Sequence, residues 1–203
     1  LLTEDKTTMS EKMVRLKVLR QDDPGAPKRW EEFSVPHVPY MNVLSALVEV
    51  QKNPVTVGGQ KTTPVAWDAA CLEEVCGSCT MIINGEVRQG CSALVDQLAQ
   101  PIEIRPMTKF PVVRDLKVDR NRLFEDFKRV HAWVDIDGTH DLGPGPRYSA
   151  EVADVRYAMS RCMACGCCLE ACPQVFASTG SACHADASDT KTNVKMDRSR
   201  IRE

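Results

Sequence analysis

The first half of the chain alternates between apolar and polar positions over short segments, as β-strands do. Residues 13–20 alternate valine and leucine with basic and polar side chains, which predicts a half-buried strand. An Asp-Asp-Pro-Gly turn follows. Residues 30–38 then predict the returning strand, with Trp30 and Phe33 as core residues.

One helix interrupts this strand pattern. Apolar residues recur with helical spacing over residues 41–52, where the side chain of Asn42 can cap the first turn. Residues 80–83 predict a strand, and Asn84-Gly85 is a turn that sends the chain back as a hairpin. Residues 101–106 alternate again and predict a last strand.

The second half changes to helical periodicity. Asp119 can cap a helix with apolar positions at Leu123, Phe127, Val130 and Val134. Ser149 can cap a further helix with apolar positions at Val152, Val155, Met159 and Cys162. Strands followed by helices predict an α+β protein.

Composition narrows the function classes. The 203 residues carry a formal net charge of −2, which favours neither nucleic acid nor a charged membrane surface as a partner. No apolar run reaches the length of a membrane span, and the first residues do not form a signal peptide. Ten cysteines in such a chain indicate cofactor ligation in a reducing compartment rather than disulfides.

One group of cysteines has the spacing C-x2-C-x2-C-x3-C-P, formed by Cys162, Cys165, Cys168 and Cys172. This is the bacterial ferredoxin run, in which three thiolates bind one [4Fe–4S] cluster and the fourth ligates another cluster. Structural zinc sites pair two short knuckles across a longer gap, so zinc fits this spacing poorly. Cys167 breaks the spacing and is interpreted as a small buried non-ligand.

The other group is Cys71, Cys76, Cys79 and Cys91, with the spacing C-x4-C-x2-C-x11-C. Its first part is the plant-type [2Fe–2S] signature. The hairpin after Cys79 explains the longer gap, because its return strand brings Cys91 back to the loop. With the order of strands and helix, these cysteines predict a β-grasp ferredoxin domain.

Four segments in this order resemble the iron–sulfur subunit of succinate dehydrogenase and fumarate reductase. They are Cys71–Cys79 (CLEEVCGSC), residues 102–107 (IEIRPM), residues 111–116 (PVVRDL) and the cysteine run from Cys162. Molybdenum hydroxylase small subunits share a similar first motif but use a different second cysteine pattern. The resemblance covers roughly residues 10–175.

The resemblance implies an electron-transfer subunit that is not catalytic on its own. It would carry electrons between an FAD-containing flavoprotein subunit, which interconverts succinate and fumarate, and a quinone at membrane-anchor subunits. It would lie peripherally on the cytoplasmic face of the membrane. The residues that match the family's ligands are Cys71, Cys76, Cys79 and Cys91 for [2Fe–2S], Cys162, Cys165 and Cys168 for [4Fe–4S], and Cys172 for [3Fe–4S].

The resemblance stops after Pro173. The remaining ligands of the [4Fe–4S] and [3Fe–4S] clusters would come from a later cysteine run, but only Cys183 follows. We therefore expect both ligand sets to be incomplete and the chain to be truncated or altered here. Two other functions stay open: a free-standing ferredoxin-like carrier with one secure [2Fe–2S] cluster, and a non-catalytic remnant.

These patterns divide the chain into three predicted parts. Residues 9–107 would form the β-grasp [2Fe–2S] domain. Residues 108–176 would form a partial helical domain of the bacterial ferredoxin type. Residues 177–203 are polar and predict a disordered tail.

Overall fold

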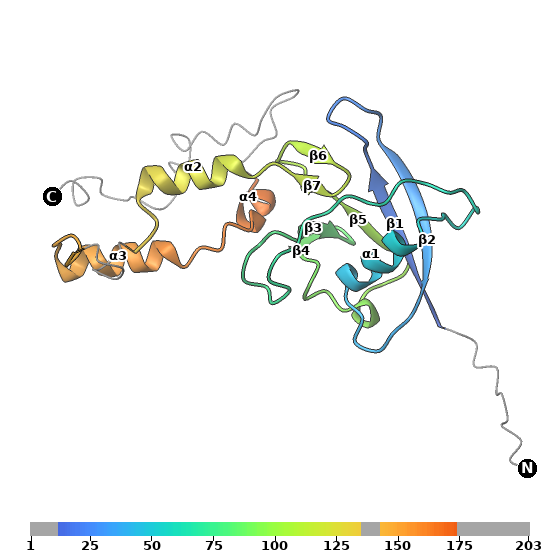
Figure 1. The fold of residues 1–203 in the computed structure, drawn as a ribbon, viewed down its shortest axis with the longest axis horizontal. Coiled ribbons are helices and arrows are strands. Elements are labelled where there is room, and N and C mark those ends of the chain that lie inside the picture. The colour runs from blue at the N-terminus through green and yellow to red at the C-terminus, as the bar shows by residue number, and fades with distance from the viewer. Residues whose placement is uncertain (1–11, 135–142, 174–203) are drawn as a thin grey trace, which may run out of the picture.

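The computed structural model describes residues 12–134 and 143–173, in which a five-stranded sheet with one helix is followed by three helices (Figure 1). The strands of the sheet are β1 (Met13–Arg20), β2 (Arg29–Pro36), β3 (Thr80–Ile83), β4 (Glu86–Gln89) and β5 (Ile102–Arg105). The other elements are α1 (Val43–Lys52), the 3-10 helix η1 (Val95–Gln97), the hairpin β6 (Val112–Arg114) and β7 (Lys117–Val118), α2 (Asn121–Val130), α3 (Ala150–Ser160) and α4 (Cys167–Ala171).

The sheet has the strand order β2-β1-β5-β3-β4 and is mixed. Strands β1 and β5 are parallel, with Leu16 opposite Ile102, whereas the other neighbouring strands are antiparallel. Parallel strands need a long crossover connection, and here it contains α1 and the hairpin β3–β4. This arrangement confirms the predicted α+β class with a β-grasp sheet.

Helix α1 packs its apolar face on the sheet. Its buried residues are Val43, Leu44, Ala46, Leu47 and Val50, and they join the core with Phe33 of β2. Asn42 caps the helix as predicted, because its Oδ1 accepts a hydrogen bond of 2.8 Å from the Ser45 N–H.

The prediction that Trp30 is a core residue is wrong. Phe33 is 1% exposed, whereas Trp30 is 41% exposed. Successive side chains of a strand point to opposite faces, so two residues three positions apart cannot share the core face. The Trp30 ring instead lies under the Lys17 ammonium group, 4.6 Å from Nζ to the ring centroid.

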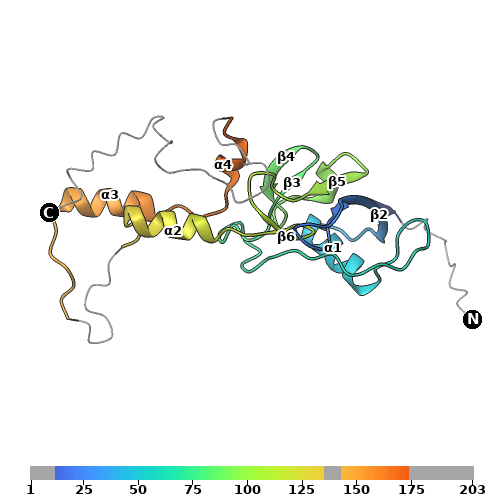
Figure 2. The same cartoon turned by 90° about the horizontal axis from the view of Figure 1, so that it is seen from above.

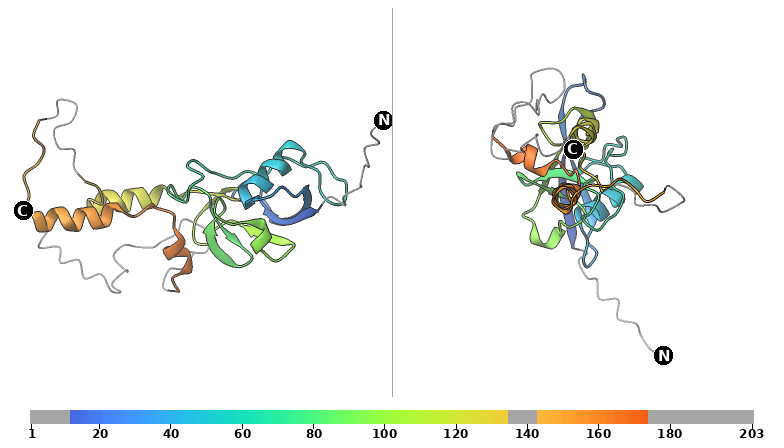
Figure 3. Two further views of the ribbon diagram at one scale, coloured as in Figure 1. Left: turned by 90° about the horizontal axis from the view of Figure 1, so that it is seen from below. Right: turned by 90° about the vertical axis from the view of Figure 1, so that its left-hand side faces the viewer.

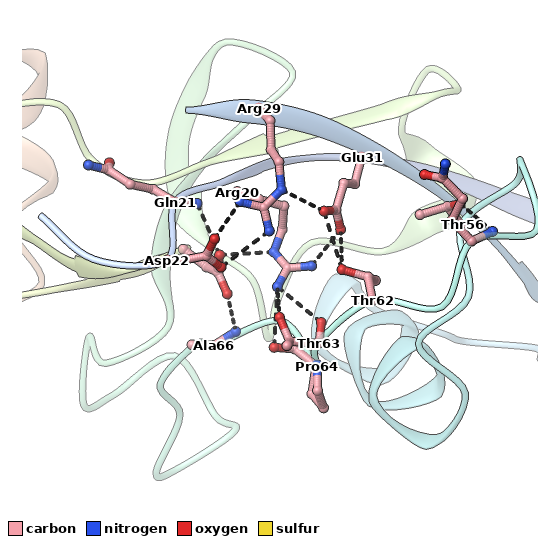
Figure 4. Close-up of polar contacts among 12 residues, drawn as sticks. Arg20, Gln21, Asp22, Arg29, Glu31, Thr56, Thr62, Thr63, Pro64 and Ala66 are labelled. Carbon is pink, nitrogen blue, oxygen red and sulfur yellow. Dashed lines mark hydrogen bonds and ion pairs between the residues drawn. The ribbon is translucent and has the colours of Figure 1, made fainter. Parts of the chain in front are cut away.

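A buried ion pair joins the hairpin β6–β7 to the sheet. Arg20 and Asp115 are both 0% exposed, and Arg20 Nε donates to Asp115 Oδ1 at 2.9 Å. Arg20 Nη1 donates to Glu31 Oε2 at 2.6 Å, and Nη2 donates to the Thr63 carbonyl at 3.0 Å (Figure 4). Asp115 Oδ2 accepts from the Ala66 N–H at 2.9 Å.

The sequence pattern did not predict this hairpin. Leu116 lies in the turn of this hairpin, is 3% exposed and belongs to the same core as the sheet. The hairpin follows residue 107, where we predict that the first domain ends, and that boundary stays a prediction.

Helices α2 and α3 extend away from the sheet (Figures 2 and 3). Helix α2 begins one residue later than predicted: Arg120, not Asp119, is the N-cap residue, although Asp119 Oδ1 accepts from the Asn121 N–H at 2.8 Å. It ends at Val130, so Val134 is not part of its apolar face. Ser149 caps α3 as predicted.

The predicted apolar faces of these two helices are not buried within the described residues. The predictions for the polar tail and for Cys183 lie outside those residues. No helix in the described ranges is long and apolar enough to span a membrane.

Candidate metal centre

The first cysteine loop directs backbone N–H groups at its sulfur atoms. Cys71 Sγ accepts hydrogen bonds from the N–H groups of Glu73, Val75 and Cys76, each at 3.3 Å. The loop therefore gives the Cys71 sulfur three backbone donors, and hydrogen bonds to the sulfurs are one means of tuning an iron–sulfur cluster.

This convergence depends on an unusual backbone. The φ angles of Leu72, Glu74 and Gly77 are +60°, +59° and +66°. Leucine and glutamate rarely adopt this left-handed conformation, and such strain concentrates at functional sites. A sequence pattern gives no signal for it at Leu72 or Glu74.

The Cys76 thiol is also prepared for ligation. Hydrogen bonds from the Ser78 side chain and backbone lower the pKa of Cys76 to about 6, and the Ser78 N–H lies 3.4 Å from Cys76 Sγ. This lower pKa favours the thiolate form of Cys76, which is the form that binds metal.

Cys79 and Cys91 form the buried side of the same site, with 3% and 8% exposure. Burial raises the pKa of Cys79 to about 11, and the thiol of Cys91 is close enough to contribute to this shift. Helix α1 positions Cys91, because Asn42 Nδ2 donates to the Cys91 carbonyl at 2.9 Å. The four thiols thus fall into two neighbouring pairs, Cys71 with Cys76 and Cys79 with Cys91.

The second cysteine run lies beside the sheet, with α4 against β4 (Figures 1 and 2). Partial burial, and then the neighbouring thiols of Cys165 and Cys162, raise the pKa of Cys168. The thiols of Cys162 and Cys165 thus lie near that of Cys168. Gly166, with φ +83°, lets the run pass close to Phe110, whose ring would lie 2.8 Å from a Cβ at this position.

The two cysteine loops are in direct contact at Gly77. A Cβ atom placed on Gly77 would lie 2.5 Å from Cys165 Cα and 2.7 Å from Cys165 Cβ. Only glycine fits this approach, both sterically and in its φ angle. Gly77 lies between Cys76 and Cys79, two candidate [2Fe–2S] ligands, and it contacts Cys165, a candidate [4Fe–4S] ligand.

The carboxylate of Glu170 fixes α4 to the segment after β5. Its Oε1 accepts from the Thr108 N–H at 2.9 Å and from the Thr108 hydroxyl at 2.6 Å, and its Oε2 accepts from the Lys109 N–H at 3.0 Å. The Lys109 ammonium group donates in turn to the Cys172 carbonyl. These bonds attach the cysteine run to the segment after β5.

The donor set fits an iron–sulfur cluster. In a [2Fe–2S] cluster held by four cysteines the thiolates divide between two irons, and two pairs of thiols match that requirement.

A protein-family model, the 2Fe-2S iron-sulfur cluster binding domain, matches residues 15–125. The chain belongs to this family. It is 57% identical over 168 residues to the succinate dehydrogenase iron-sulfur subunit of Bacillus subtilis, covering 82% of this chain and 66% of the relative. It is 27% identical over 166 residues to the fumarate reductase iron-sulfur subunit of Wolinella succinogenes, covering 79% of this chain and 66% of the relative.

A solved structure supports the fold. The Mycobacterium smegmatis Sdh1 complex in the apo form contains a chain with a TM-score of 0.59 and 24% identity, and the match covers 80% of this chain and 64% of that one. The present chain thus spans about two thirds of the length of these proteins.

These comparisons confirm the resemblance stated from the sequence and the [2Fe–2S] cofactor. The assignment of individual cysteines stays a prediction, which the structure supports by grouping them as described. Sequence reasoning missed the polar residues that hold the second cysteine run in place. Arg120, Gln89 and Glu170 belong to no recognised motif, and their roles depend on contacts between distant segments.

Proposed function

We propose that this chain is an electron-transfer protein of the succinate dehydrogenase and fumarate reductase type. It would pass electrons between an FAD-containing flavoprotein and a membrane quinone. The observation that carries this proposal is the contact between Gly77 and Cys165, because a redox relay needs its centres close together and the chain packs its two cysteine loops directly on each other.

The proposed ligands are those inferred from the sequence. A [2Fe–2S] cluster would be held by Cys71, Cys76, Cys79 and Cys91. Part of a [4Fe–4S] cluster would be held by Cys162, Cys165 and Cys168, and part of a [3Fe–4S] cluster by Cys172. Bound clusters supply one-electron chemistry, and the protein positions them and tunes their potentials.

The chain's own residues favour this role in separate ways. Backbone N–H groups of Glu73, Val75 and Cys76 donate to Cys71 Sγ, and that of Ser78 donates to Cys76 Sγ. Burial of Cys79 and Cys91 keeps water from the inner side of the site. Gly77 lets the second loop pack against the first, and Glu170 fixes α4 to the segment after β5.

The partners follow from the relatives rather than from contacts in this chain. A flavoprotein would dock near the first loop, where Leu72 and Val75 are 61% and 62% exposed beside Glu73 and Glu74. A membrane-anchor subunit and quinone would lie on the side of the second loop. The protein would then be peripheral on the cytoplasmic face of the membrane.

Site-directed replacement of single cysteines tests the ligand assignment. The wild type, Cys76→Ala and Cys167→Ala are purified anaerobically, and iron, acid-labile sulfide and the EPR spectrum of the reduced protein are measured. We expect a rhombic [2Fe–2S] signal in the wild type and in Cys167→Ala, and its loss in Cys76→Ala. A folded wild type that contains zinc and no iron would contradict the proposal.

A further inference from the structure

A single arginine spans the contact between the two cysteine loops. Arg120 Nη1 donates to the Gly77 carbonyl at 2.6 Å and to the Ala164 carbonyl at 2.9 Å. Gly77 lies between Cys76 and Cys79, and Ala164 precedes Cys165. One guanidinium group therefore holds a carbonyl from each loop.

A second set of hydrogen bonds closes the contact on its other side. The Thr80 hydroxyl donates to the same Gly77 carbonyl at 2.9 Å. Gln89 Nε2 donates to Thr80 Oγ1 and to Cys167 Sγ, both at 3.4 Å. Together with Arg120, these side chains form a continuous path of hydrogen bonds from the first loop to both ends of the Ala164–Cys167 segment.

We propose that Arg120 is a positioning residue for electron transfer between the two clusters: it holds the cysteine loops together and places a positive charge between them. This inference rests on the proposed function, because it requires clusters at both loops. It gives Cys167 a structural role as a hydrogen-bond acceptor next to the ligands.

The charge has a defined consequence for the redox potential. Reduction adds an electron, so a fixed cation nearby stabilises the reduced form and raises the potential, and net charge and hydrogen bonding are recognised means of tuning these clusters. Arginine keeps its charge at every relevant pH and offers several donors in a rigid plane. Arg120 is half-buried, so solvent screens its charge less than that of a surface residue.

Three variants of the whole chain separate position from charge. Arg120→Met removes both the charge and the hydrogen bonds, whereas Arg120→Lys keeps the charge on a side chain without the planar fork. Arg129→Met is the matched control, because it removes the same charge from the same helix at a residue whose side chain is 67% exposed. The two readouts are the midpoint potential of the [2Fe–2S] EPR signal and hydrogen exchange in residues 163–168 by mass spectrometry.

We expect Arg120→Met to lower the midpoint potential and to speed exchange in residues 163–168 by about tenfold to a hundredfold, as for the loss of a hydrogen bond to a charged group. Arg120→Lys should retain a potential near that of the wild type while exchange stays faster. Arg129→Met should change neither. An unchanged potential in Arg120→Met would overturn the inference, even with faster exchange. Absence of the [2Fe–2S] signal from the wild type would instead overturn the proposed function.

Discussion

Replacing Asp115 by alanine tests the physical basis of the fold most severely. Its carboxylate is 0% exposed and accepts hydrogen bonds from Arg20, Gln21 and Ala66. Removing one partner of a buried ion pair costs about 3–5 kcal/mol, because the other charge stays buried without compensation. Glu31 also binds Arg20, so we expect a value near the lower end of this range.

Hydrogen exchange measures this cost without requiring reversible unfolding of a cluster-containing protein. The N–H groups of Gln21 and Ala66 donate directly to Asp115, and the Asp115 and Leu116 N–H groups donate back to the carbonyls of Gln21 and Ala66. A loss of about 3 kcal/mol corresponds to roughly a hundredfold faster exchange at these amides.

The matched control is Glu32→Ala. Glu32 pairs with Arg15 at 3.0 Å, but the two side chains are 43% and 55% exposed. Such surface pairs contribute about 0–1 kcal/mol, so exchange should change by less than about tenfold. If Asp115→Ala accelerates exchange no more than Glu32→Ala does, the buried network does not hold the β6–β7 hairpin and the reasoning fails.

Three further substitutions test the site. Gly77→Ala should displace the second loop, because its methyl group would lie 2.5 Å from Cys165 Cα. Hydrogen exchange over residues 163–168 should therefore rise more than in the control Gly85→Ala, where the φ angle is similar but a Cβ meets no atom within 4 Å. Glu170→Ala should release α4, with faster exchange at Thr108 and Lys109 than in Glu151→Ala, and equal rates would show that the clamp is unimportant. Asn42→Ala should destabilise α1 by about 0.5–2 kcal/mol, because it removes the cap. Asn42→Asp keeps the cap and loses only the hydrogen bond to the Cys91 carbonyl, so an equal fall in melting temperature for the two variants would contradict the cap assignment.

The sequence predicted the elements whose apolar spacing and local chemistry agree. The helix α1 follows from its apolar face and from Asn42, and the hairpin β3–β4 follows from Asn84-Gly85 between two apolar segments. The two cysteine spacings predicted the class of cofactor, because ligand spacing is a local property of the chain.

The features that the sequence did not predict depend on tertiary contacts. The β6–β7 hairpin has strands of only three and two residues, and it is held by Asp115 binding Arg20 from a strand 95 positions earlier. In the sequence Arg120 is an ordinary residue that flanks a helix. Its role depends on the fold, which brings the carbonyls of Gly77 and Ala164 within reach of its side chain. Trp30 and Phe33 lie three positions apart on one strand, so their side chains face opposite sides of the sheet and only Phe33 joins the core.

Reduction of the clusters by succinate is the measurement that tests the central claim most directly. The chain is co-expressed with its candidate flavoprotein, purified anaerobically, mixed with succinate and frozen for EPR at successive times, with Cys76→Ala as the control. We predict that the [2Fe–2S] signal grows in the wild-type complex after succinate is added and is absent from the control. A wild-type cluster that dithionite reduces but succinate does not, in a complex whose flavin is reduced, would contradict the claim that this chain carries electrons from a succinate-oxidising flavoprotein.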